Sequence, residues 1–333
     1  MWSWTGVVVA GLLNGSFAVP LKTTRAWKFH HIWMIFSLLA MAIIPWLGVL
    51  VVVPRWNEIL GAVPGRGWAG LVSLGLVWGV ASLLYGVAVD LLGIALGFAI
   101  QLGLSIVLGA LLPLIWARAL SLRTTGDWLY MAGLAGMVVG IVLCARAGGA
   151  KSTAPGASGA QFRKGLIIAI LGGIGAPLLN FGIQYGISLL RAARQIPTEA
   201  TFSVNTYVAW AVFLSGAAVT QAGYCLYRIV KENRLGVFSS EGTGHDATLV
   251  TVMSVVWAAS VCVYGMSAVS LGRLGVSFGW PIFIGFIVLT SNAWGVFLGE
   301  WKGASKAAFY RMLAGSAVLM AAAFLIGQGN PGA

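Results

Sequence analysis

The sequence predicts an all-α integral membrane protein with ten transmembrane helices, arranged as a five-plus-five inverted repeat. Hydrophobic residues make up 59% of the 333 residues and charged residues only 8%, whereas a soluble domain has about 25% charged residues. Ten apolar stretches are each long enough to cross a bilayer, which takes about 20 residues. Finally, a 17-residue stretch that begins at Val77 recurs in altered form 179 residues later.

The charge and cysteine content narrow the class of protein further. A net charge of +12 could suit a nucleic-acid-binding protein, but the basic residues stand singly in loops between apolar runs, as in cytoplasmic loops of membrane proteins. We therefore expect a lipid bilayer as partner and no nucleic acid. Cys144, Cys225 and Cys262 lie in apolar runs or at their ends and lack metal-binding spacing. We expect neither a metal nor a cofactor.

The ten spans follow from counting apolar residues along the chain. They cover residues 2–21, 31–53, 67–89, 92–116, 127–147, 164–189, 203–229, 248–269, 274–299 and 308–328. The third and fourth are nearly continuous, so a tight turn is expected near Asp90–Gly93. Five pairs of glycines have the four-residue spacing of small residues that lets membrane helices approach closely: Gly11–Gly15, Gly93–Gly97, Gly136–Gly140, Gly182–Gly186 and Gly275–Gly279. No basic segment precedes the first span, which predicts a retained helix.

A polar, Gly- and Ser-rich connection near the middle of the chain divides it into domains. We predict a first five-helix repeat at 1–147, a linker at 148–163 and a second five-helix repeat at 164–333. The loops after spans 1, 3, 5, 7 and 9 hold thirteen of the twenty Lys and Arg residues. The positive-inside rule places that side in the cytoplasm. Both termini are then expected outside, in a bacterial-type inner membrane.

The repeated stretch predicts the symmetry. "VWGVASLLYGVAVDLLG" at 77–93 and "VWAASVCVYGMSAVSLG" at 256–272 share six residues in the same slots. They fall in the third and eighth spans, an odd number of crossings apart, so the copies cross the membrane in opposite directions. "GSFAVPL" at 15–21 and "GGIGAPL" at 172–178 form a weaker echo in spans one and six. Inverted repeats are typical of secondary transporters, which hold substrate near the midplane between the halves.

Three stretches also carry a family resemblance. "NGSFAVPLK" in the first span, "WGVASLLYGVAVDLLGIALGFAIQLGLSIVLGALLPLI" across the third and fourth, and "FLGEWKGAS" after the ninth resemble the L-rhamnose–proton symporter family of the drug/metabolite transporter superfamily. The resemblance covers most of the chain. It implies a ten-helix inverted-repeat carrier that moves a deoxy-sugar inward by symport with a proton.

A neutral sugar would need hydrogen-bonding side chains at membrane depth, where polar groups are costly and hence informative. Amides both donate and accept, which suits hydroxyls, and aromatic rings offer a face for stacking. The substrate-binding candidates are Asn14, Gln101, Asn180, Gln184, Asn205, Tyr207, Tyr264, Trp280 and Asn292. Each amide could instead join helices, a contribution of about 0.6 to 2 kcal/mol. Their spread over both halves favours a polar cavity. The repeat-paired Trp78 and Trp257 are interpreted as structural.

The group that would bind the proton is harder to identify. Proton carriers at membrane depth are usually Asp, Glu or His, and none of the eight acidic residues lies at the centre of a span. Asp90 and Glu300, at the ends of spans three and nine, are the nearest candidates, with interfacial charge as the alternative interpretation. The resemblance implies an acidic residue early in the ninth span, where "VSFGWPIF" has Gly279. Coupling to a proton, to another ion or to none stays open.

Other functions fit the sequence less well. A carrier of the same fold for another small metabolite and an uncoupled sugar facilitator both remain alternatives. The lack of a central acid argues against a cationic substrate. No cluster of His, Asp and Glu, no Ser/His pair and no metal spacing occurs within the spans, so an enzyme is not expected. An inverted repeat without a ring of charges disfavours a channel. The sequence does not predict an oligomeric state.

Overall fold

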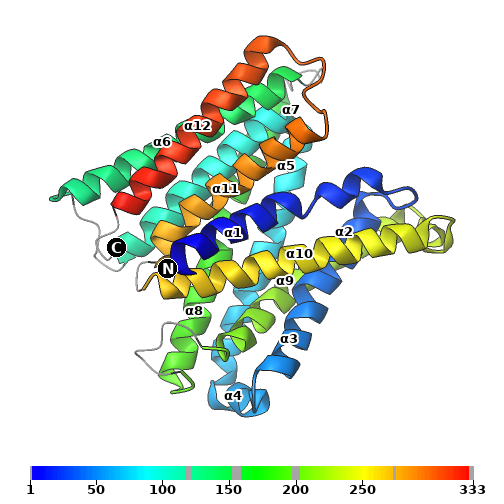
Figure 1. The fold of residues 1–333 in the computed structure, drawn as a ribbon. Helices are drawn as coiled ribbons and strands as arrows, with labels where there is room; N and C mark the ends of the chain where they lie inside the picture. The colour runs from blue at the N-terminus through cyan, green and yellow to red at the C-terminus, as the bar shows by residue number, and fades with distance from the viewer. Residues whose placement is uncertain (1, 117–121, 152–158, 197–202, 273–274, 330–333) are drawn as a thin grey trace. The chain divides into compact units, whose positions relative to one another are not determined.

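The computed structural model describes residues 2–116, 122–151, 159–196, 203–272 and 275–329, which are mostly helical with no strand among them (Figure 1). The elements in order are α1 (Trp2–Ser16), η1 (Val19–Thr23), α2 (Phe29–Leu38), η2 (Leu39–Ile43), α3 (Ile44–Val52), α4 (Trp56–Ala62), α5 (Gly65–Trp116), α6 (Thr125–Lys151), α7 (Gly159–Gly175), α8 (Leu178–Ala192), α9 (Thr206–Lys231), η3 (Leu235–Ser239), α10 (Thr243–Ser270), α11 (Gly275–Phe297) and α12 (Lys306–Gln328).

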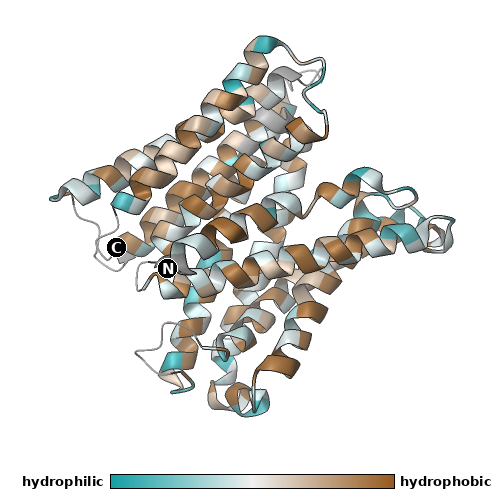
Figure 2. Cartoon of the chain, viewed as in Figure 1, coloured by the Kyte–Doolittle hydropathy of each residue, from teal (hydrophilic) through white to brown (hydrophobic). Residues whose placement is uncertain are grey.

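Nine helical segments within the described residues are long and apolar enough to cross a membrane, and the shorter apolar helix Ala99–Ile115 occupies the predicted fourth span. Figure 2 shows apolar residues along the helices and hydrophilic residues gathered in the turns. The chain is thus a multi-pass membrane protein, as composition predicted. Of the predicted linker, residues 148–151 continue α6 and α7 begins at Gly159; residues 152–158 lie outside the described part.

α5 contains both the third and the fourth predicted spans, and the chain reverses within it. In a straight helix residues 84 and 101 would lie about 25 Å apart, at about 1.5 Å of rise per residue. Here Nε2 of Gln101 lies 3.4 Å from the carbonyl oxygen of Leu84. A Cβ on Gly97 would lie 3.1 Å from Cα of Val89. The reversal between Val89 and Gly97 therefore falls at the predicted tight turn.

The chain forms two compact units, each built from segments that are distant in sequence. Unit 1 comprises Met1–Ser16, Ala81–Pro177 and Val263–Ala333, and unit 2 comprises Phe17–Val80 and Leu178–Cys262. The chain passes between the units in the first, third, sixth and eighth spans. Each unit thus draws on both predicted repeats, a different division from the predicted domains, which follow chain order.

In unit 1, glycines allow the helices to pack closely. α6 lies beside α12, and α1 packs on α11 (Figure 1). A Cβ on Gly11 would lie 2.5 Å from Cβ of Phe286, and a Cβ on Gly15 would lie 2.5 Å from Cβ of Thr290. Neither contact is sterically possible, so α1 reaches its position on α11 only because both residues lack a side chain, as the spacing of these two glycines predicted.

In unit 2, the largely buried helix α9 packs against α2, α3 and α8. Nε1 of Trp46 donates to Oγ of Ser215 on α9 at 2.9 Å. Between α2 and α3, η2 is a π-helical turn directly before Pro45. Proline has no N–H to donate and its ring clashes with the preceding turn, so the wider π turn accommodates Pro45 without ending the span.

Trp78 and Trp257, the tryptophans shared by the two copies of the repeated stretch, contact each other in unit 2. Their ring centroids lie 6.4 Å apart with 29° between the planes, and both side chains are buried. Phe213 packs beside Trp78 at 5.9 Å. The pair packs against its neighbours, in keeping with the structural role that the sequence suggested.

The buried carboxylate of Asp246 fixes one end of unit 2. It accepts hydrogen bonds from the backbone N–H groups of Arg25, Ala26 and Trp27, at 2.9, 2.8 and 2.8 Å. Nε1 of Trp27 donates to Oγ1 of Thr243 at 3.3 Å. The segment that follows the first span is therefore held on the first turn of α10, where the helix dipole also favours an acid.

Candidate functional site

In unit 1, the predicted residues Trp280 and Tyr264 lie in one buried aromatic cluster. The Trp280 ring centroid lies 5.7 Å from that of Tyr264 and 5.8 Å from that of Phe283. Its Nε1 donates to the backbone oxygen of Ser105 on α5 at 3.0 Å. The indole rests against Gly109, where a Cβ would meet it. The indole is thus a buried aromatic group held in a fixed position within the membrane-spanning part of unit 1.

Pro281 follows Trp280 inside α11 and shapes this region. Because proline has no N–H, the carbonyl oxygen of Ser277, four residues earlier, loses its helical partner. The hydroxyl of Tyr130 on α6 donates to that oxygen at 3.1 Å. Tyr130 thereby compensates the broken helical ladder and connects α6 to the start of α11, which fixes the backbone on which Trp280 stands.

Gln101 is buried on α5, one turn before Ser105. A carbonyl oxygen can only accept, so the contact at 3.4 Å with the oxygen of Leu84 assigns Nε2 to that side. Oε1 is buried without a hydrogen-bond partner. A Cβ on Gly172 would lie 2.5 Å from Nε2, and one on Gly173 would lie 3.1 Å from Cα of Gln101. The "GGIGAPL" glycines thus make room for this amide.

Two further candidates in unit 1 are half-buried. Asn14 lies in α1 and Asn292 in α11. Nδ2 of Asn292 lies 3.3 Å from Sγ of Cys144 and 3.3 Å from Oγ of Ser316. Because Asn292 joins α11 to α6 and α12 in this way, its contacts are those of an amide that connects helices.

The remaining candidates lie in unit 2. Asn180, which is buried, and Gln184, which is half-buried, stand one turn apart on α8. Nδ2 of Asn205 donates to the carbonyl oxygen of Gln195 and so ties the start of α9 to the end of α8. Tyr207, in the first turn of α9, accepts a hydrogen bond from Sγ of Cys262 at 3.1 Å. The nine substrate-binding candidates are therefore divided between the two units.

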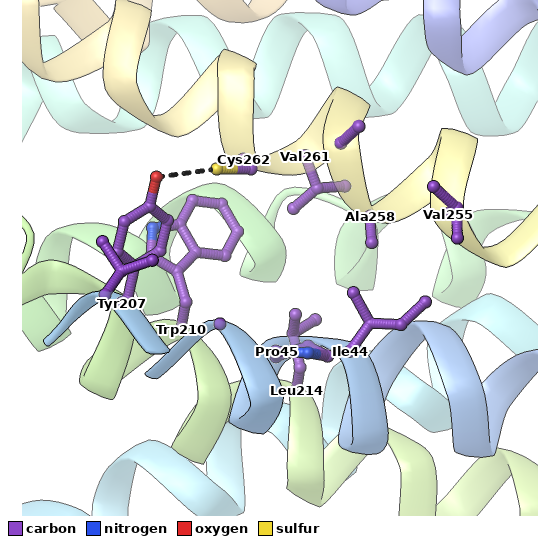
Figure 3. A pocket seen from close by; sticks show the side chains of 12 residues that line it. Ile44, Pro45, Tyr207, Trp210, Leu214, Val255, Ala258, Val261 and Cys262 are labelled. Atoms are coloured by element: carbon purple, nitrogen blue, oxygen red, sulfur yellow. Dashed lines mark hydrogen bonds between the residues drawn. The ribbon is translucent and has the colours of Figure 1, made fainter. Parts of the chain in front are cut away.

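Tyr207 also lines a cavity of about 290 Å³ in unit 2 (Figure 3). The lining residues come from α3 (Ile44, Pro45, Gly48, Val52), α9 (Tyr207, Trp210, Leu214) and α10 (Val255, Ala258, Ala259, Val261, Cys262). The Tyr207 hydroxyl and the Cys262 thiol bond to each other, and aliphatic side chains dominate the rest of the wall. A ligand with several hydroxyls would leave most of them unpaired here, so the cavity suits apolar groups better than a sugar.

Of the two proton-coupling candidates, Asp90 and Glu300, the structure describes the side chain of Glu300 only. The backbone of Asp90 belongs to α5, but its side chain lies outside the described part. Glu300 is exposed in the turn after α11. Its N–H bonds to the oxygen of Gly295, and the N–H of Gly299, at φ 73°, bonds to that of Val296. This is a Schellman motif that ends the helix. Gly279 packs against Tyr264 and Val7.

Sequence reasoning overlooked one buried amide, Gln221 in α9. Its Oε1 accepts from Nε1 of Trp33 at 2.8 Å and from Oγ of Ser37 at 3.4 Å, while Nε2 is buried without a partner. The position of this glutamine within the apolar seventh span could have identified it as a candidate. Throughout the described ranges, no group of three or more His, Cys, Asp and Glu side chains could hold a metal ion.

A family model and individual known proteins both match nearly the whole chain. The family model described as "L-rhamnose-proton symport protein (RhaT)" matches residues 1–331. The chain is 23% identical to an L-rhamnose-proton symporter of Yersinia pestis (strain Pestoides F) over 339 residues, covering 99% of this chain and 96% of the relative. It is 22% identical to the L-rhamnose-proton symporter of Cronobacter sakazakii (strain ATCC BAA-894), with the same coverage. The chain therefore belongs to the L-rhamnose-proton symport protein family, a family of membrane transporters.

Proposed function

We propose that the chain is a secondary carrier that takes up L-rhamnose, or a closely related neutral sugar, together with a proton. The family match over residues 1–331 carries this proposal. The aromatic cluster around Trp280 and the buried amide of Gln101 supply the stacking surface and the hydrogen-bonding group that such a substrate needs. The nine predicted substrate-binding residues and the assignment to the drug/metabolite transporter superfamily belong to the same proposal.

We further propose that the ten spans form a five-plus-five inverted repeat. The chain passes between the units in spans 1, 3, 6 and 8, which are two repeat-equivalent pairs, (1, 6) and (3, 8). Within the units, helices of equivalent spans pack together: α6 with α12, and α2 with α9. A residue contacts its own symmetry mate only near a two-fold axis. The stacking of Trp78 on Trp257 is what such an axis through unit 2 would produce.

Alternating access is the mechanism that this organisation favours. Inverted-repeat carriers expose their substrate site to either side by moving one part of the protein against the other. Two of the four connections between the units coincide with helix ends, because α1 stops at Ser16 and α7 stops at Gly175, before Pro177. Interrupted helices in repeat-equivalent spans are typical of transporter binding regions. They also provide joints about which the units could move.

For the proton, Asp90 and Glu300 remain the proposed coupling residues. Substitution by the isosteric amides removes the titrating group and preserves shape. If either residue carries the proton, Asp90→Asn or Glu300→Gln abolishes accumulation driven by a pH gradient but allows sugar exchange across the membrane. Both termini outside and an inner-membrane location complete the proposal, on the basis of the distribution of Lys and Arg.

Uptake of labelled L-rhamnose into proteoliposomes tests the function. We expect saturable uptake that an inward proton gradient accelerates and a protonophore suppresses. Saturable uptake that ignores the gradient would identify an uncoupled facilitator instead. If neither L-rhamnose nor any other neutral sugar enters faster than in protein-free vesicles, the proposal is wrong.

Amide variants test the site in the same assay. Gln101→Ala or Asn180→Ala should raise the apparent binding constant for the sugar. Asn57→Ala, at an exposed position of α4, provides a matched control with no expected effect. Unchanged uptake in every variant of a buried amide would reject the proposed site while leaving the transport function intact.

A further inference from the structure

In the described part of unit 1, three buried polar atoms lack a hydrogen-bond partner: Oε1 of Gln101, Oγ of Ser105 and Oγ of Ser277. All three side chains are at most 1% exposed. A buried polar group without a partner has lost its hydrogen bonds to water and gained nothing in return, so it is unfavourable. Three such groups in one unit of a membrane protein need a reason for their presence.

Other serines in the spans show that a partner is easily found. Ser37, Ser215 and Ser254 each donate to the carbonyl oxygen four residues earlier in their helix, at 2.7 Å. This local bond is the usual way in which a helical serine satisfies its hydroxyl. Ser105 lies deep within α5, where the carbonyl of Gln101 stands at the corresponding position, yet its hydroxyl does not make this bond.

The serines flank Trp280. Ser105 lies one turn after Gln101 on α5, and its carbonyl oxygen accepts the hydrogen bond from the indole. Ser277 lies three residues before Trp280 on α11, so the two share one side of that helix. Spacing and this hydrogen bond thus bring Gln101, Ser105 and Ser277 to the two helices that hold the indole.

We propose that Ser105 and Ser277 bind substrate hydroxyls in unit 1, together with Oε1 of Gln101 and beside the indole of Trp280. This inference rests on the proposed sugar transport and names further specificity-determining residues for it. A serine hydroxyl both donates and accepts, whereas an amide oxygen only accepts, so the ligand must offer hydroxyl donors. The three groups are themselves uncharged, which suits an uncharged ligand. A neutral pyranose meets both conditions.

The three groups are closed off from solvent in this conformation. Ligand binding therefore requires α5 and α11 to separate at this point. A hydroxyl that makes no hydrogen bond in the closed conformation can bond to the ligand without first breaking an internal bond. The whole free energy of the new hydrogen bond then favours ligand binding. This is the difference between Ser105 and a serine such as Ser254, whose hydroxyl already bonds to the oxygen of Val250.

Stability and binding respond in opposite directions if the proposal holds. Ser105→Ala and Ser277→Ala remove unpaired polar groups, so the thermal midpoint of the purified protein without sugar should stay the same or rise. The L-rhamnose concentration needed for a given thermal shift should increase by about tenfold or more, which corresponds to one lost hydrogen bond to the ligand. Ser254→Ala, a buried serine with its local bond, should leave the response to L-rhamnose unchanged.

Two results would overturn the inference. One is a response of both serine variants to L-rhamnose within about twofold of the wild-type response, measured in the same mass-action experiment. The other is a loss of binding that accompanies a lower midpoint without sugar, since this would reveal a structural role. A wild-type protein that responds to no neutral sugar would instead contradict the proposed function, which keeps the two failures distinct.

Discussion

The contact between Gly109 and Trp280 provides a sharp test of the unit 1 cluster. A Cβ on Gly109 would lie 2.5 Å from Nε1 of Trp280, so Gly109→Ala must displace the indole. The ring cannot move freely, because it is 3% exposed and packed against both Tyr264 and Phe283. Overpacking a core costs about 1–3 kcal/mol. Loss of the bond to the oxygen of Ser105 costs about 1–3 kcal/mol more.

We therefore expect Gly109→Ala to lower the free energy of unfolding by about 2–6 kcal/mol and to weaken sugar-dependent stabilisation. Gly103 on the same helix is the matched control, because the nearest atom to its Cβ would be Cγ1 of Val138 at 3.9 Å. Gly103→Ala should be neutral or stabilising, since alanine favours the helix by up to about 1 kcal/mol. Thermal unfolding in detergent measures both variants.

A second substitution tests whether the effect of Gly109→Ala comes from the contact with Trp280 or from a change elsewhere in the helix. Trp280→Leu in the Gly109→Ala background removes the ring that the new methyl group displaces. The double variant should be more stable than the sum of the single effects predicts, because residues in direct contact are coupled. Equal midpoints for Gly109→Ala and Gly103→Ala, or strict additivity in the double variant, would refute the packing described for Trp280.

Three other predictions concern unit 2. Asp246→Asn should destabilise the protein by about 2–4 kcal/mol in thermal unfolding, because a neutral amide cannot replace a carboxylate that accepts three backbone N–H groups; an unchanged midpoint would contradict that role. Trp46→Phe should cost about 1 kcal/mol, since it leaves the half-buried hydroxyl of Ser215 with its bond to Ala211; a cost above about 4 kcal/mol would contradict this estimate. A small apolar thiol reagent should modify Cys262, which is half-buried beside the cavity, before the two buried cysteines. Mass spectrometry of digested protein measures the order of modification, and earlier modification of a buried cysteine would contradict the prediction.

Hydropathy predicted the spans well because the bilayer imposes a minimum apolar length on each one. The observed segments Phe29–Val52 and Thr206–Lys231 begin and end within about three residues of the predicted 31–53 and 203–229. Interruptions within the spans were less visible. The π turn Leu39–Ile43 depends on how Pro45 is accommodated against the preceding turn. The five apolar residues of the turn carry no sign of it.

The candidate site was harder to predict, because residue type alone does not show which hydrogen bonds a side chain makes. Amides in apolar sequence are conspicuous, so Gln101 was found, but a serine in a helix is unremarkable because it normally bonds to its own backbone. Only the three-dimensional contacts separate Ser105 from Ser254. Asn292 and Asn205 were equally conspicuous in the sequence, and in this conformation both amides bond to neighbouring segments of the protein. Residue type indicates the capacity for hydrogen bonding, and the contacts decide how it is used.

The 179-residue offset of the repeated stretch also relates residues that lie beyond the stretch itself. It carries Trp78 onto Trp257, which stack on each other, and it carries Gln101 onto Trp280. The first pair is identical, and in the proposed inverted repeat it would lie near the axis that relates the two copies. The second pair differs: one copy has an amide that can bond to hydroxyls, and the other has an indole that can stack. A pyranose has polar edges and a less polar face, so it is recognised by such a mixture and not by two equal groups. Divergence between the copies at this position would thus turn a symmetric scaffold into one with a sugar-specific site.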